Sequence, residues 1–189
     1  MAGLVEDHVQ QGRVREASPL VLGVALVHRQ TAAERDRGHK LLAEVSDVFR
    51  RRGHTLGELP IVNVYLARER ARRRDPDAAI PRMRTAIEDL FREGQLGSGV
   101  LATGVLVETL LDRGAETDVV EAEAAIERLA AAAADEGLVI REISLLRLRA
   151  LLARAHGDAR AYADFRDRYR NMARTLGFEG HIAWGEAMP

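Results

Sequence analysis

The stretch IPRMRTAIEDLFREG, residues Ile80–Gly94, carries the clearest signal for a helical fold in this chain. Its large apolar residues recur three or four positions apart, with charged residues between them: Ile80, Met83, Ile87, Leu90 and Phe91. This spacing places the apolar side chains on one face of an α-helix. Gly94 follows, and a glycine just beyond a helix readily takes the left-handed conformation that ends it. The stretch therefore predicts an amphipathic helix that stops at Gly94.

The same pattern occurs three more times along the chain. The segment over residues 36–52 comes before Gly53, and two others come before Gly137 and Gly177. Their apolar residues are Leu41, Val45, Val48 and Phe49 in the first, Ala122, Ile126, Leu129 and Ala133 in the second, and Tyr162, Phe165, Tyr169, Met172 and Leu176 in the third. The four glycines lie 41, 43 and 40 residues apart, which indicates a repeat of about 40 residues.

More apolar segments alternate with the charged ones, over residues 18–29, 60–74, 100–113 and 139–156. PIVNVYLA and GVLVET within them have the β-branched content of strands, but their alternation with amphipathic helices favours buried helices. The sequence therefore predicts an all-α fold, a solenoid of about four helical hairpins of roughly 40 residues that forms a single domain over residues 1–189.

One helix start is marked by the pair Asp75 and Pro76. Aspartate is a good N-cap, and proline suits the first helical position because its missing N–H is not needed there. Pro81 offers an alternative start, or a kink within the helix.

The composition narrows the functional classes. The 189 residues are 47% hydrophobic, 30% charged and 4% aromatic, with 28 basic and 29 acidic residues. This balance argues against a nucleic-acid binder and against a polybasic membrane anchor. No apolar run approaches the ~20 residues of a membrane span, and no signal peptide is visible. The absence of cysteine excludes disulfides and thiolate sites and fits a cytoplasmic location.

The chain shows no enzyme signature, and we expect no catalytic residue, cofactor or metal. The glycine-rich stretch Gly94–Gly104 lacks the lysine of a phosphate loop and is interpreted as a turn between helices. Glu179, His181 and Glu186 make the nearest group of metal-ligating types, but no further ligand is local. We interpret this C-terminal stretch as a closing helix, in which Ile182, Trp184 and Met188 cover the last hairpin and the polar residues face water.

Two arginine-containing stretches have functional alternatives. The cluster RERARRR favours a solvated helix end, where cations complement the dipole, and its functional alternative is a patch for an acidic partner or phosphate. That patch would consist of Arg68, Arg70, Arg72, Arg73 and Arg74. YADFRDRYRNM, residues 162–172, alternates aromatics with arginine, and helical spacing favours core packing over RNA stacking.

Blocks along nearly the whole chain resemble one bacterial family. They are ASPLVLGVALVHR, GELPIVNVYLARERARRRD, AIEDLFREGQLG, ATGVLVETLLDRGAE, AEAAIERLAAAAADEGL and YRNMARTLGFEGHIAWGEAMP. The family consists of large signalling proteins with a class III adenylate/guanylate cyclase domain, an AAA-type ATPase region and a tetratricopeptide-like (TPR-like) helical tail. The resemblance is to the tail, and implies an excised tail or a stand-alone relative. No cyclase or Walker motif is present, so no catalytic residue is carried over.

The function expected is that of a non-catalytic interaction or regulatory module, with a protein partner or attached cyclase and ATPase domains. Stacked hairpins present an extended surface on which exposed residues vary while the core stays fixed. The alternatives are a small-ligand sensor and, less favoured, an enzyme with dispersed catalytic residues. Exposed apolar end faces would also favour homo-oligomers.

Overall fold

The computed structural model describes residues 19–29, 31–51, 58–73, 75–132 and 138–189, and every regular element within these ranges is an α-helix. The prediction of an all-α fold is confirmed. The strand alternative for PIVNVYLA and GVLVET is wrong, because both segments lie inside helices. No helix in the described ranges has both the length and the apolar content needed to cross a membrane.

The chain divides into two compact units, Met1–Glu93 and Gly94–Pro189. A single domain over residues 1–189 stays a prediction.

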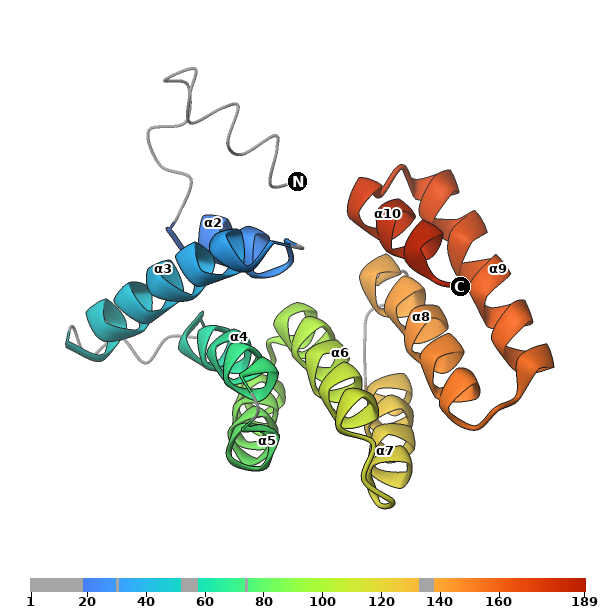
Figure 1. Ribbon diagram of the computed structural model, residues 1–189, viewed down its shortest axis with the longest axis horizontal. Helices are drawn as coiled ribbons and strands as arrows, with labels where there is room; N and C mark the ends of the chain where they lie inside the picture. Colours follow the sequence, from blue (N-terminus) through green and yellow to red (C-terminus); the bar gives the residue numbers. More distant parts are fainter. Residues whose placement is uncertain (1–18, 30, 52–57, 74, 133–137) are drawn as a thin grey trace. The chain divides into compact units, whose positions relative to one another are not determined.

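In the described part of the first unit, helices α2 to α5 form two packed pairs (Figure 1). Helix α2 packs on α3, α4 packs on α5, and both α2 and α3 contact α4. The bounds are Pro19–Val27 for α2, Ala32–Arg51 for α3, Glu58–Arg72 for α4 and Pro76–Arg92 for α5. Each of these helices matches a predicted segment to within a few residues.

The start and end of α5 follow local sequence signals. The carboxylate of Asp75 accepts a hydrogen bond from the Ala78 N–H, and Pro76 is the first helical residue, as predicted. Pro81 lies inside the helix, so the alternative start at that residue is wrong. Gly94 follows the helix with φ of +71°, the left-handed conformation predicted for it. Gly53 and Gly137 lie outside the described residues.

Two glycines let α2 and α3 approach closely. A Cβ atom added to Gly38 of α3 would lie 2.8 Å from the carbonyl oxygen of Gly23 and 2.8 Å from Cβ of Leu26 in α2. The buried residues of α3 are Gly38, Leu42 and Ser46, which lie on the side of this contact. The predicted stripe of Leu41, Val45, Val48 and Phe49 is only half-buried. The prediction of which face of α3 is buried was therefore wrong, because the buried residues lie about one position away from the predicted stripe.

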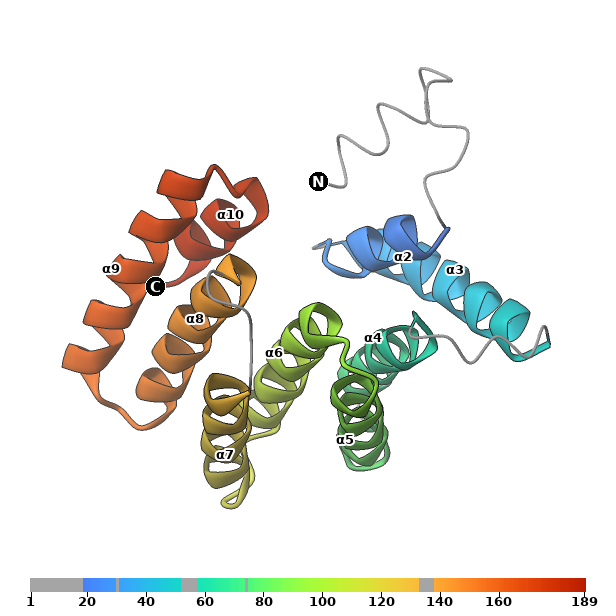
Figure 2. The ribbon, with the colours of Figure 1, turned by 180° about the vertical axis from the view of Figure 1, so that it is seen from behind.

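The described residues of the second unit form helices α6 to α10, and α8 and α9 run side by side (Figure 2). Helix α6 packs on α7, α8 on α9, and α10 on α9, while α6 and α7 both contact α8. The bounds are Leu96–Arg113 for α6, Asp118–Ala131 for α7, Val139–Ala155 for α8, Ala159–Leu176 for α9 and Glu179–Ala187 for α10. Gly177 ends α9 with φ of +65°, as predicted.

A buried ion pair closes the turn between α6 and α7. The side chain of Asp118 is fully buried and accepts hydrogen bonds from Arg113 Nε at 2.9 Å and from the Ala115 N–H at 2.8 Å. A second oxygen of Asp118 accepts from Arg113 Nη2 at 2.5 Å. Because both carboxylate oxygens have donors, the cost of burying the charge is offset.

The aromatic residues of α9 pack inward. Tyr169 is fully buried with Ile143, Ala150 and Ala173, and Tyr162 and Phe165 pack against this cluster while half-buried. The prediction that the aromatic residues of 162–172 pack in the core is confirmed.

Candidate functional site

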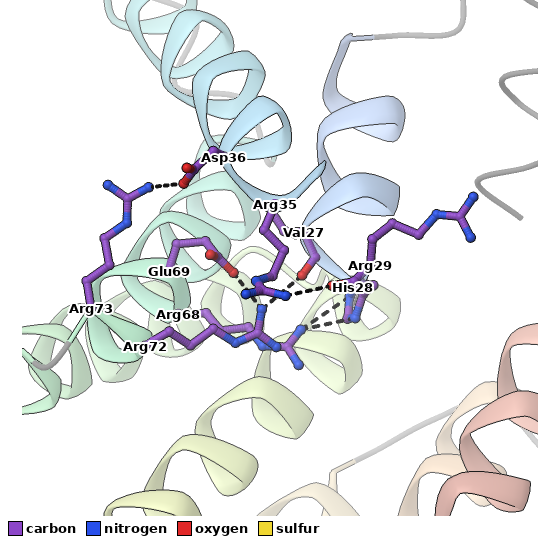
Figure 3. Close-up of polar contacts among 9 residues, drawn as sticks. All are labelled: Val27, His28, Arg29, Arg35, Asp36, Arg68, Glu69, Arg72 and Arg73. Atoms are coloured by element: carbon purple, nitrogen blue, oxygen red, sulfur yellow. Dashed lines mark hydrogen bonds and ion pairs between the residues drawn. The ribbon is translucent and has the colours of Figure 1, made fainter. Parts of the chain in front are cut away.

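The predicted basic patch lies at the C-terminal end of α4, but its side chains take two directions (Figure 3). Arg68 and Arg72 extend to the end of α2, whereas Arg73 extends to Asp36 of α3. Arg70 bonds to Asp75. Arg74 lies outside the described residues. Arg68 and Arg72 therefore do not share one surface with Arg73.

Arg68 and Arg72 hold α4 against the end of α2. Arg72 Nη1 donates to the carbonyl oxygen of Val27 at 3.0 Å and to the buried Glu69 carboxylate at 2.7 Å. Arg68 Nη1 donates to Nδ1 of His28 at 3.0 Å, and the His28 ring lies edge-on to Tyr65. Cations at a helix C-terminus are favoured by the helix dipole. These two members of the patch therefore have a structural role.

Arg70 and Arg73 remain accessible despite their partners. Arg70 Nε donates to Asp75 at 2.6 Å, and Arg73 Nη2 donates to Asp36 at 2.6 Å. The hydrogen bond from Arg70 lowers the pKa of the Asp75 carboxyl below its ordinary value. The side chains of Arg70 and Arg73 are 43% and 55% exposed. Exposed pairs of this kind are weak because solvent screens both charges, so an incoming carboxylate can compete for either arginine.

Arg70 and Arg73 line an open groove between α3, α4 and α5, with a volume of about 950 Å³. We call it the α3–α5 groove. Its charged lining consists of Arg50, Arg70, Arg73 and Arg82 against Asp75 and Asp89. Nearly buried Ala67 and Ala86, together with half-buried Leu66, form its apolar floor. The lining itself therefore has an excess of arginine over an apolar base, while Asp36 and Asp47, which lie outside the lining, pair with Arg73 and Arg50 at exposed positions.

His39 lines the same groove without adding to its charge. Burial lowers the pKa of the His39 imidazole below its ordinary value of 6.5, and the Arg73 charge lowers it further. The imidazole is therefore neutral at neutral pH, and the positive character comes from the guanidinium groups alone.

Arg50 and Arg82 are the groove residues that sequence analysis missed. They lie on α3 and α5, at positions far from the RERARRR cluster in the sequence. No local pattern relates them to Arg70 and Arg73, because only the packing of α3 and α5 on α4 brings the four together.

The C-terminal stretch is a closing helix, but His181 does not face water as predicted. Its Nδ1 lies 2.9 Å from the hydroxyl oxygen of Tyr169, and its ring lies edge-on to Trp184. Burial and the charge of Arg147 lower the pKa of His181 from 6.5 to about 4. A neutral imidazole costs less to bury than a charged one, and the hydrogen bond to Tyr169 gives its Nδ1 a partner. His181 can therefore pack inward although it is polar.

Trp184 joins the closing helix to α8 and α6. The guanidinium of Arg147 lies 4.9 Å from the Trp184 ring centroid, and Arg147 also pairs with Glu108 of α6 at 2.5 Å. Ile182 and Met188 pack into the cluster around Tyr169, as predicted. The arrangement ties α10 to the rest of the second unit.

Two candidates from the sequence remain: the C-terminal group of metal-ligating residue types and the glycine-rich stretch. Neither forms a recognisable binding site in the described residues. Across the described ranges, no three His, Cys, Asp or Glu side chains gather in a way that could hold a metal ion, and Glu179, His181 and Glu186 lie within those ranges. In the glycine-rich stretch Gly94–Gly104 only Gly94 and Gln95 form the turn before α6, and residues 96–104 lie inside that helix, so the interpretation of the whole stretch as a turn is wrong beyond residue 95.

Comparisons with family models, curated proteins and solved structures give no significant match for this chain. The resemblance to the helical tail of cyclase and ATPase proteins therefore stays an expectation.

Proposed function

We propose that this chain is a non-catalytic helical-repeat module that binds a polypeptide partner through the α3–α5 groove. The observation that carries the proposal is the groove itself, with four arginines against two aspartates at its rims and an apolar floor. Acidic polypeptides complement such a surface in charge, and complementary charge increases both the association rate and the specificity.

The openness of the groove favours a polypeptide over a small ligand. Small-molecule sites commonly enclose most of the ligand surface, whereas the side chains of Arg50, Arg70 and Arg73 are 60%, 43% and 55% exposed. A small anion here would keep most of its surface in water. A segment of polypeptide can contact several arginines and the apolar floor together.

The packing within each unit supports a stack of hairpins. In the first unit α4 contacts both helices of the preceding pair, and in the second unit α8 does the same. Four such pairs would make a TPR-like solenoid of hairpins with roughly 40 residues each, which is the architecture we propose. Such folds bind partners through residues that vary without affecting the core.

The family resemblance suggests where the partner lies. If the chain corresponds to the tail of a cyclase and ATPase protein, its partner is an attached domain or a protein of the same signalling system. Its regulatory role would then require a difference in affinity between two states of that partner.

The proposal is tested by fluorescence anisotropy with a labelled glutamate-rich helical peptide and a lysine-rich peptide of equal length. We expect the acidic peptide alone to bind, with affinity that falls as salt is raised. The double variant R50E/R82E should bind it at least about tenfold more weakly. R160E/R174E is the matched control, because both residues are exposed on α9 in the second unit. Equal binding by all three proteins would contradict the proposal.

A further inference from the structure

We infer that the α3–α5 groove binds helix α7 of a second copy of this chain, so that copies associate head to tail. The inference rests on the proposed function, because it names the polypeptide that the groove takes. It draws on the surface of α7, on the distribution of charge along the chain and on the lining of the groove.

Helix α7 carries an exposed face that combines an apolar residue with acidic ones. Val120 is 69% exposed, the highest value among the large hydrophobic residues in the described part of the chain. Glu123, Ala124 and Glu127 are also exposed and lie three to seven positions after it, on one side of the helix. The opposite face is buried in the second unit through Ala122, Ile126 and Leu129.

The glutamates of this face remain accessible. Glu127 forms an ion pair with Arg149 at 3.6 Å, yet its side chain is 66% exposed. A pair this long and exposed is weak, so Glu127 can exchange Arg149 for another guanidinium.

Charge is distributed unevenly between the two units. Residues 1–93 carry 17 basic and 14 acidic residues, and residues 94–189 carry 11 basic and 15 acidic residues. The stretch 108–136, which includes α7, holds nine acidic residues and only two arginines. The whole chain is close to neutral, at −1, so repulsion between copies is small.

The groove and the α7 face are complementary in the sign of their charge and in the way that charged residues border apolar ones. In the groove, arginines border an apolar floor that contains Leu66, Ala67 and Ala86. On α7, Glu123 and Glu127 lie beside Val120 and Ala124. An amphipathic helix in a groove is a common mode of recognition. Here Val120 would contact the floor, and the two glutamates would meet Arg50 and Arg82.

The contact is heterologous, because the groove and α7 are different surfaces of the same chain. Such contacts form closed rings or open chains, and the smallest ring is a pair of copies in which each groove holds α7 of the other. Association therefore either stops at a closed ring or continues as concentration rises.

Sedimentation velocity of the full chain tests the inference. At low salt the average mass should rise above 20.9 kDa with concentration. At about 1 M salt, where the Debye length is roughly 3 Å, it should return towards the monomer. A mass of 20.9 kDa at every concentration and salt would overturn the inference.

Charge exchange identifies the two surfaces. R50E/R82E has an acidic groove, and E123R/E127R has a basic α7, so each variant alone should self-associate at least about tenfold more weakly. An equimolar mixture should associate again, because each groove then meets an α7 face of opposite charge. R160E/R174E makes the same change in net charge as R50E/R82E and should behave like the wild type. Association that survives both exchanges, or a mixture that stays monomeric, would overturn the inference.

The anisotropy experiment separates the two proposals. A monomeric wild-type chain that still binds the glutamate-rich peptide would overturn self-association and leave the proposed function standing, with another protein as the partner. A monomeric chain that binds no acidic peptide would overturn both.

Discussion

The hydroxyl of Tyr169 lies 2.9 Å from Nδ1 of His181, so a buried tyrosine of α9 is hydrogen-bonded to the closing helix α10. Tyr169 is fully buried, and burial raises the pKa of its hydroxyl. The pKa of His181 is lowered to about 4. Both groups are therefore neutral at neutral pH, which suits a hydrogen bond inside the packed unit.

The lowered pKa of His181 makes stability depend on pH. In the unfolded chain the imidazole takes up a proton near pH 6.5, but in the folded protein it does so only near pH 4. The unfolded state therefore binds more protons between these values, and stability falls as pH drops from about 6.5 to 4. The loss should approach about 3 kcal/mol. Urea unfolding of the wild type and of H181Q at several pH values measures this loss of stability. Because the carboxylates titrate in both proteins, the difference between the two pH curves gives the contribution of His181. Parallel pH curves would contradict the assignment.

Tyr169 and Phe165 should differ in their contribution to stability although both lie on the apolar face of α9. Tyr169 is fully buried, so Y169A should cost about 3–5 kcal/mol, as for other truncated core aromatics. Phe165 is half-buried, with Arg168 over its ring at 5.7 Å, so F165A should cost roughly 1–3 kcal/mol. Thermal or urea unfolding gives both values. A larger loss for F165A would mean that α9 is rotated relative to the structure.

The contact between α2 and α3 makes Gly38 sensitive to a single added methyl group. G38A places a Cβ at 2.8 Å from Gly23 O and 2.9 Å from Val27 N, which are backbone atoms that do not move easily. We expect a loss of about 1–3 kcal/mol from overpacking, despite the better helix propensity of alanine. G104A is the control, because a Cβ at that helical glycine meets nothing within 4 Å. It should stabilise by up to about 1 kcal/mol. Similar effects of the two substitutions on the unfolding midpoint would contradict the close contact.

Asp118 should be the most sensitive carboxylate of the α6–α7 turn. D118A removes the partner of Arg113 and of the Ala115 N–H inside the second unit, so a loss of about 3–5 kcal/mol is expected. D118N keeps an acceptor for Ala115 but loses the charge, and should fall between wild type and D118A. E116A, at an exposed position of the same turn, is the control and should change stability by less than about 0.5 kcal/mol. Urea unfolding of the three variants decides the order, and a small loss for D118A would show that the ion pair contributes little.

Local signals in the sequence predicted the elements well. Asp75 with Pro76 marked the start of α5, and the glycines at positions 94 and 177 marked two ends, because caps depend on neighbours in the chain. The face of α3 was not predictable in this way. Its contact with α2 uses Gly23 and Gly38, and glycines do not contribute to an apolar stripe.

The candidate site was only partly predictable for a related reason. Arg70 and Arg73 stood out as part of a basic run, whereas Arg50 and Arg82 joined them only through the packing of three helices. The inward position of His181 depends on Tyr169, twelve residues earlier, and on Arg147 from α8. Long-range contacts of this kind cannot be predicted from the spacing of residues within one segment of the sequence.

Mapping of amide chemical shifts shows whether acidic polypeptide binds in the α3–α5 groove. The isotope-labelled full chain would be titrated with the glutamate-rich helical peptide at low salt. We predict perturbations that centre on Arg50, Asn63, Arg82 and Thr85, which line the groove, while the amides of α9 stay unchanged. A spectrum that does not change, or one that changes at α9 and not in the groove, would contradict the account.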